Sequence, residues 1–170
     1  KINALRSIFK NNFRVLEAEN GKRAIEVLEE NKYQVDIILL DLVMPEMDGL
    51  EFLAIKKENP DMTIWAVEPE NAAILSGGSI GTHIQMGIGD GVIPEILNQD
   101  IYDDVCIVKD EEALQTSKDL ASKEGIMCGI SSGTNVAAAL RLAKMLGKGK
   151  TVVTVLPDTA ERYFSTPLFE

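Results

Sequence analysis

The sequence has few of the residues from which metal centres, nucleic-acid interfaces and membrane spans are built. Its 170 residues include two cysteines, one histidine and only 5% aromatics, with 17 basic against 27 acidic residues. The net charge of −10 repels nucleic acid and anionic membranes, so neither is an expected partner. The longest apolar runs fall far short of the roughly 20 residues that cross a bilayer, and the first residues show no signal-peptide pattern. We expect a cytoplasmic protein.

The cysteines and the histidine lack the spacing of a metal site or a catalytic triad. Cys106 lies within an apolar stretch and Cys128 precedes Gly129, so both are interpreted as buried free thiols. His83 has no partner at ligand or triad spacing and is expected on the surface or in a loop. The few aromatic residues do not alternate with basic ones, which again argues against a nucleic-acid interface.

Apolar strands alternate with amphipathic helices along the chain, a pattern typical of parallel sheets with right-handed crossovers. The expected strands are residues 13–18, 35–40, 63–67, 104–108 and 151–156, and the expected helices are 22–31, 50–58, 111–123 and 136–146. We predict a single three-layer α/β/α domain over residues 1–170, with a mostly parallel five-stranded sheet of flavodoxin-like or Rossmann-like type.

Four local features suggest helix ends and a loop. Asp110 can cap the helix that begins at Glu111, and Gly147 ends the helix that begins at residue 136. The serines of residues 131–132 are interpreted first as N-caps of that helix and second as ligand contacts. The glycine-rich passage 76–94 is either a binding loop or lid, or a segment whose glycines serve turn geometry alone.

Asp41 ends a nearly all-apolar strand, at the edge where open α/β sheets bind ligands. Taken alone, it is most simply an acid that hydrogen-bonds the next loop. However, residues 39–49, with residues 17–21 before them, closely resemble the receiver domain of bacterial response regulators over about residues 1–59. The resemblance implies that Asp41 accepts phosphate from a histidine kinase and that the carbonyl of Val43 helps to bind Mg²⁺, which screens the charge that accumulates during phosphoryl transfer.

The receiver pattern is incomplete. Its first strand and two metal-binding acids would precede Lys1, and Glu68 replaces the threonine or serine of its fourth strand, which would place a negative charge beside the phosphate. We hypothesise that strand 151–156 fills the central place of the missing strand in a circularly permuted flavodoxin-like order. Asp158 would then be a substitute metal ligand near Asp41, and Lys109 would be the phosphate-binding lysine. Coincidence is the alternative, and carboxylates of Asp41 and Asp158 more than about 8 Å apart could not share an ion.

The second part of the chain carries a different set of motifs. They are Val67–Pro69, Gly87–Pro94, Cys128–Gly133 and Leu156–Tyr163. From about Met62 to Phe169 they strongly resemble the carboxyl-terminal part of cysteine synthase (O-acetylserine sulfhydrylase), a fold-type-II pyridoxal-phosphate enzyme. The resemblance implies that Ser131 hydrogen-bonds the pyridine nitrogen of the cofactor and that Gly87, Ile88 and Gly89 border the substrate.

The part of cysteine synthase that this chain resembles does not include the family's main catalytic and cofactor-binding residues. The Schiff-base lysine, the substrate-carboxylate loop and the phosphate cradle all precede the strand that matches residues 63–67, where this chain has receiver sequence. We expect a chimera, residues 1–59 receiver-derived and 60–170 cysteine-synthase-derived, that does not retain pyridoxal phosphate and is catalytically inactive.

Two alternatives stay open. One is a signalling or binding module phosphorylated at Asp41, and the other is a cysteine synthase fragment completed by another chain. A histidine kinase, a small-molecule ligand and a second copy of the chain are the partners to consider. Residues 56–69 form an ordinary helix, turn and strand unit, at which two parallel sheets could be joined without breaking the local pattern.

Overall fold

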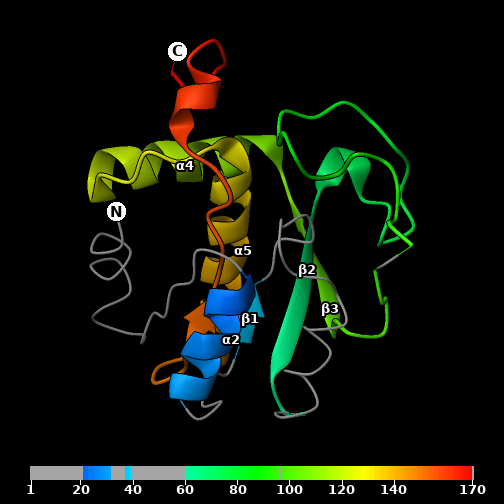
Figure 1. Cartoon of the computed structure of the whole chain (residues 1–170). Helices are drawn as coiled ribbons and strands as arrows, with labels where there is room; N and C mark the ends of the chain where they lie inside the picture. The colour runs from blue at the N-terminus through cyan, green and yellow to red at the C-terminus, as the bar shows by residue number, and fades with distance from the viewer. Residues whose placement is uncertain (1–20, 32–36, 40–59, 96, 170) are drawn as a thin grey trace.

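The computed structural model describes residues 21–31, 37–39, 60–95 and 97–169 (Figure 1). Its elements, in chain order, are α2 (Gly21–Glu30), β1 (Ile37–Leu39), β2 (Thr63–Pro69), the 3-10 helix η1 (Glu70–Ala72), β3 (Asp104–Val108), α4 (Asp110–Glu124), α5 (Ile130–Leu146), β4 (Val152–Val153) and the 3-10 helix η2 (Ala160–Tyr163). The expected strand 13–18 and helix 50–58 lie outside the described residues.

The four described strands form one parallel sheet in the order β3-β2-β1-β4. Ile38 of β1 pairs with Ile64 of β2 on one side and with Val153 of β4 on the other. The predicted α/β class with a parallel sheet is therefore confirmed. The last strand lies beside β1, as the permuted order requires, but the pairing of residues 13–18 that would make it central falls outside the described residues.

β4 is shorter than the strand 151–156 expected from the apolar run. Its described pairing with β1 ends at Val153. Two residues later, the carbonyl of Val155 accepts a hydrogen bond from Nδ2 of Asn135, at 3.0 Å. Beyond the described pairing, the backbone of residue 155 thus bonds a side chain of α5.

α5 is buried over its first ten residues, and its packing against α4 and the sheet forms the core. Both helices are rich in small residues, which lets their backbones approach closely. A Cβ atom on Gly133 would overlap the carbonyl oxygen of Ala113 and Oγ of Ser117, both on α4. Glycine at this position is therefore required by the contact between the two helices. The thiols of Cys106 and Cys128 are free and buried, as predicted.

Two predicted helix caps are wrong. α5 begins at Ile130, six residues before the expected start, and its N-cap is Gly129, with no capping hydrogen bond from a side chain. Ser131 and Ser132 thus lie inside the first turn, where they are 3% and 0% exposed. Similarly, the N-cap of α4 is Lys109, because the Asp110 carboxylate accepts hydrogen bonds from the glycine-rich passage instead. Gly147 ends α5 as predicted.

Candidate functional site

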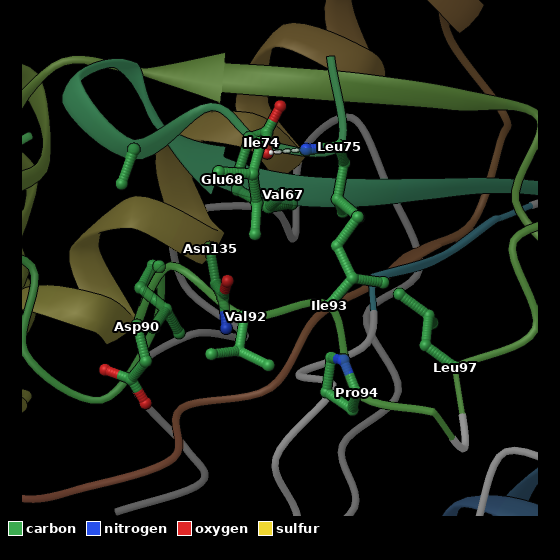
Figure 2. Close-up of a pocket in the computed structure, with 13 residues that line it drawn as sticks. Val67, Glu68, Ile74, Leu75, Asp90, Val92, Ile93, Pro94, Leu97 and Asn135 are labelled. Carbon is green, nitrogen blue, oxygen red and sulfur yellow. Dashed lines mark hydrogen bonds between the residues drawn. The ribbon is translucent and has the colours of Figure 1, made fainter. Parts of the chain in front are cut away.

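A cavity of about 180 Å³ lies at the carboxyl end of β2, between that strand, the start of α5 and the glycine-rich passage (Figure 2). Most of its wall is apolar, and its polar residues are Glu68, Asp90 and Asn135. The lining residues are Val67, Glu68, Ala72, Ile74, Leu75, Ile88, Gly89, Asp90, Val92, Ile93, Pro94, Leu97 and Asn135. Ligands of open parallel sheets bind at this edge, so the cavity is the candidate site.

Glu68 shapes the turn that follows β2. The residue is 3% exposed. Its carboxylate accepts hydrogen bonds from the backbone N–H of Leu75 at 2.8 Å and of Ser76 at 3.0 Å, and from the Ser76 hydroxyl at 2.5 Å. The Glu68 carboxylate, which was expected to place a negative charge beside the receiver phosphate, therefore holds residues 69–76 in place. Hydrogen bonds to an ionised acceptor are about twice as strong as neutral ones, which makes this a firm wall for the cavity.

Gln85 anchors the glycine-rich passage to the sheet edge. It is fully buried, and its Nε2 donates to the carbonyl of Val108 at 3.0 Å and to Oδ1 of Asp110 at 2.8 Å. Its Oε1 accepts a hydrogen bond from the Thr134 hydroxyl at 2.8 Å. One amide thus joins the loop to β3, α4 and α5. The loop lies at the end of the sheet where α5 begins (Figure 1).

His83 and Gly89 close the loop onto itself. The backbone N–H of Gln85 donates to Nδ1 of His83 at 3.2 Å, so Nε2 is left to donate to the carbonyl of Gly89, also at 3.2 Å. Gly89 has φ of 68°, and an added Cβ would lie 2.7 Å from Cγ of Pro69. His83 is half-buried in a loop, as predicted. Ile88 and Gly89 of the predicted substrate loop line the cavity, whereas Gly87 is absent from its described lining.

Ser131 and Asp158 form a second cluster with Tyr163, beside the amino end of α5. The Asp158 carboxylate accepts hydrogen bonds from the Tyr163 hydroxyl and from the Ser132 hydroxyl, the latter at 3.5 Å. Burial, followed by the hydrogen bond to Asp158, raises the pKa of Tyr163, while a hydrogen bond with Ser131 opposes this shift. Gly129 is needed here because a Cβ would overlap Oδ1 of Asp158. Both predicted site residues thus contact the Tyr163 region, and neither is part of the described cavity wall.

Neither cysteine is an activated nucleophile. Burial, and next the nearby Asp158 carboxylate, raise the pKa of the Cys128 thiol to about 11. Burial also raises the pKa of Cys106. Because the thiolate is the reactive form, both groups stay protonated at neutral pH and serve as core residues.

The predicted metal and phosphate residues are only partly described. Asp41 and Val43 lie outside the described residues, so the distance from Asp41 to Asp158 is not defined. Lys109 is exposed, and its Nζ lies 3.7 Å from Oε1 of Glu70. No group of three or more His, Cys, Asp or Glu side chains placed to hold a metal ion occurs among residues 21–31, 37–39, 60–95 and 97–169. In the same ranges, every helix is too short or too polar to cross a membrane.

Sequence reasoning missed Gln85 and Asn135, the two amides whose hydrogen bonds connect the segments around the cavity. Gln85 lies in a passage without hydrophobic periodicity, and Asn135 directly precedes the apolar run that begins at Val136. An amide side chain next to a long apolar run was the available signal for Asn135, since buried amides need hydrogen-bond partners.

Comparison with known proteins identifies both parts of the chain. The family model "Pyridoxal-phosphate dependent enzyme" matches residues 52–158, and the model "Response regulator receiver domain" matches residues 2–75. The two matches overlap at residues 52–75, which contain the helix, turn and strand unit of residues 56–69.

Curated relatives and solved structures agree with the first of these models. A cysteine synthase of Staphylococcus aureus is 52% identical over 115 residues, and a probable cysteine synthase of Bacillus subtilis is 46% identical over 116 residues. Each alignment covers 68% of this chain and 37% of the relative, so the chain spans well under half the length of these relatives.

Two solved structures are also similar. The O-acetylserine dependent cystathionine beta-synthase of Helicobacter pylori has a TM-score of 0.77 and 31% identity, over 86% of this chain and 48% of that one. The cysteine synthase of Entamoeba histolytica has a TM-score of 0.75 and 29% identity, over 99% of this chain and 53% of that one. The chain therefore belongs to the pyridoxal-phosphate dependent enzyme family, and it joins a segment similar to the carboxyl-terminal part of cysteine synthase to a segment similar to a response regulator receiver domain.

Proposed function

We propose that this chain is a hybrid α/β scaffold that does not by itself convert O-acetylserine and sulfide to cysteine and acetate. The cavity at the carboxyl end of β2 carries the proposal. Its described wall contains the carboxylates of Glu68 and Asp90 and the amide of Asn135, and it contains no lysine or arginine. A family enzyme needs a lysine to hold its cofactor covalently, and this wall offers none.

Pyridoxal phosphate, the cofactor that the family implies, does not fit the described residues. Its phosphate is an anion, and a wall whose charged groups are both carboxylates repels it. Ser131, the predicted partner of the pyridine nitrogen, is 3% exposed and hydrogen-bonds the Tyr163 side chain. The proposal therefore includes weak or absent retention of the cofactor by this chain alone.

We also propose that residues 1–170 fold as one domain rather than as two. β1 belongs to the segment matched only by the receiver model, whereas β4 lies in the segment matched only by the pyridoxal-phosphate enzyme model. β1 pairs with β4 and with β2. A sheet shared in this way couples the unfolding of the two segments.

An assay of cysteine formation tests the proposed lack of turnover. We expect the purified chain, with O-acetylserine, sulfide and added pyridoxal phosphate, to form no more cysteine than the same mixture without protein. Intact Staphylococcus aureus cysteine synthase is the positive control. The physical reason is the missing covalent anchor. Sulfide-dependent cysteine formation that is lost in Ser131→Ala would overturn the proposal. Activity that arises only when a separately expressed amino-terminal half of the synthase is added would support completion by another chain instead.

Phosphorylation at Asp41 is a second candidate function, favoured by the receiver match over residues 2–75. Asp41 lies outside the described residues, but it follows β1 closely, and Leu39 of β1 is in register with Trp65 of β2. A histidine kinase would be the partner and Mg²⁺ the metal. Asp158 gives little support as a further metal ligand, because its carboxylate is engaged by Tyr163 and Ser132.

Fluorescence of Trp65, the single tryptophan, tests this candidate. Beryllofluoride with Mg²⁺ forms a stable mimic of a phosphorylated carboxylate, and we expect it to change the emission of Trp65 if Asp41 is the acceptor. The change should disappear in Asp41→Asn and persist in Asp48→Asn, a control in the same segment. An unchanged spectrum, or a change that survives in Asp41→Asn, would rule out this function.

A further inference from the structure

Glu68 is a buried acid whose described partners are all neutral. The N–H groups of Leu75 and Ser76 and the Ser76 hydroxyl supply its hydrogen bonds, and no ion pair joins it to a described lysine or arginine. Neutral donors satisfy the oxygen atoms but leave a net negative charge at a site that is 3% exposed. A carboxylate that is shielded from water gains from a cation brought close to it.

Asn135 adds an oriented acceptor to the same cavity. The residue is 4% exposed, and its side chain extends from α5 towards Val92 (Figure 2). Nδ2 donates to the carbonyl of Val155 at 3.0 Å, which fixes the orientation of the amide. Oδ1 is therefore the group that Asn135 offers to a ligand, and it accepts hydrogen bonds only.

The remaining wall selects for an apolar body of limited size. Side chains of Ile74, Leu75, Ile88 and Leu97 line the cavity, and their apolar surface favours aliphatic or aromatic groups. A cavity of about 150 Å³ holds one benzene molecule, so the 180 Å³ here has room for a ligand of roughly eight heavy atoms. Val92, 72% exposed, and Asp90 lie at the solvent side of the wall.

From these contacts we propose that the cavity at the carboxyl end of β2 binds a small organic cation, a primary ammonium ion on an apolar body. The ammonium group donates to Oδ1 of Asn135, and the Glu68 and Asp90 carboxylates of the same wall favour its positive charge. The apolar body fills the space among Ile74, Ile88 and Leu97. Asp90 at the rim and the net charge of −10 attract cations and repel anions. This inference goes beyond the proposed lack of turnover, and it needs neither pyridoxal phosphate nor phosphorylation.

Three ligands of similar shape distinguish the contribution of charge to binding from that of apolar contact. Benzylamine at pH 7 is the cationic probe, benzyl alcohol is its neutral counterpart and benzoate is an anion of similar size. In titrations of the full chain followed by amide NMR shifts, we expect benzylamine to bind with a dissociation constant of about 1 mM or tighter. Benzyl alcohol should bind at least fivefold more weakly, and benzoate should not bind. The largest shifts should occur at the amides of Leu75, Ser76 and Asn135.

Two substitutions locate the site. Ala72→Leu places a larger side chain in the cavity wall and should weaken benzylamine binding at least tenfold. Asp90→Asn removes the rim charge and should weaken it about twofold to fivefold, since exposed charges contribute modestly. Glu70→Gln is the control, because Glu70 is exposed and lies outside the described cavity wall, and it should leave affinity unchanged.

Several outcomes would overturn the inference. They are equal binding of benzyl alcohol and benzylamine, shifts located away from the cavity, and unchanged affinity in a folded Ala72→Leu variant. If Ala72→Leu does not fold, the three ligands with the unmodified chain and with Asp90→Asn decide the question. Cysteine formation is measured with other compounds, so the failure of one proposal is distinguishable from the failure of the other.

Discussion

Gly133→Ala should destabilise the chain by about 3 kcal/mol or more. This is the largest effect that we expect from a substitution that removes no existing contact. The added methyl group would overlap the carbonyl of Ala113 and Oγ of Ser117, and a backbone carbonyl within α4 cannot move aside alone. α4 and α5 must separate, which exposes the apolar residues between them. For a chain of this size the midpoint of thermal unfolding should fall by about 6 to 12 °C.

Gly149→Ala is the matched control for this substitution. Gly149 has φ of 83° and no heavy atom within 4 Å of an added Cβ, so alanine there is strained by backbone conformation alone, which costs about 1 kcal/mol. Equal losses in the two variants would contradict the close contact between α4 and α5.

Urea unfolding followed by both far-UV circular dichroism and Trp65 fluorescence should give one midpoint, as one hybrid domain requires.

Glu68→Ala should release the turn at residues 69–76 and destabilise it by about 2 to 3 kcal/mol. Two N–H groups and one hydroxyl lose their carboxylate acceptor. The N–H groups of Leu75 and Ser76 must then hydrogen-bond water or remain unpaired. Native-state hydrogen exchange measures the effect directly. Exchange at these two amides should accelerate about thirtyfold or more, since each 1.4 kcal/mol corresponds to about a factor of ten.

Glu70→Ala, two residues along the chain, is the control for Glu68→Ala. Its carboxylate is 3.7 Å from Nζ of Lys109, and both side chains are at least half exposed to solvent, so the loss should stay below about 0.5 kcal/mol. Unaltered protection of Leu75 and Ser76 in Glu68→Ala would show that the carboxylate does not hold the turn. Slower exchange would contradict the assignment of these hydrogen bonds.

The hybrid character of this chain was readable from the sequence because its motifs are local. The receiver segment around Asp41 and the cysteine-synthase segments around Gly89 and Ser131 each consist of consecutive residues, and the family models confirm both assignments. The strand of residues 104–108 was likewise predicted with its exact bounds, since a short apolar run between polar turns is a local signal.

The partners of polar side chains were not readable in the same way. Asp110 was expected to cap a helix and instead receives hydrogen bonds from Ile84 and Gln85, about 25 positions away in the chain. Ser131 was expected first as a helix cap, and it lies inside the first turn of α5, buried beside Tyr163. In each case, a distant segment competes with the local backbone for the same polar group, and spacing in the sequence contains no information on that competition.

The sequence by itself determined the alternation of strands and helices, the parallel class of the sheet and the two origins of the chain, because hydrophobic periodicity and contiguous motifs are properties of neighbouring residues. Only the tertiary structure decided that Glu68 holds a turn, that Gln85 joins the glycine-rich passage to three elements, and that Asn135 and Glu68 lie on one cavity. These arrangements depend on which distant groups meet when the chain folds, and the free energy of each hydrogen bond depends on burial that no local pattern specifies.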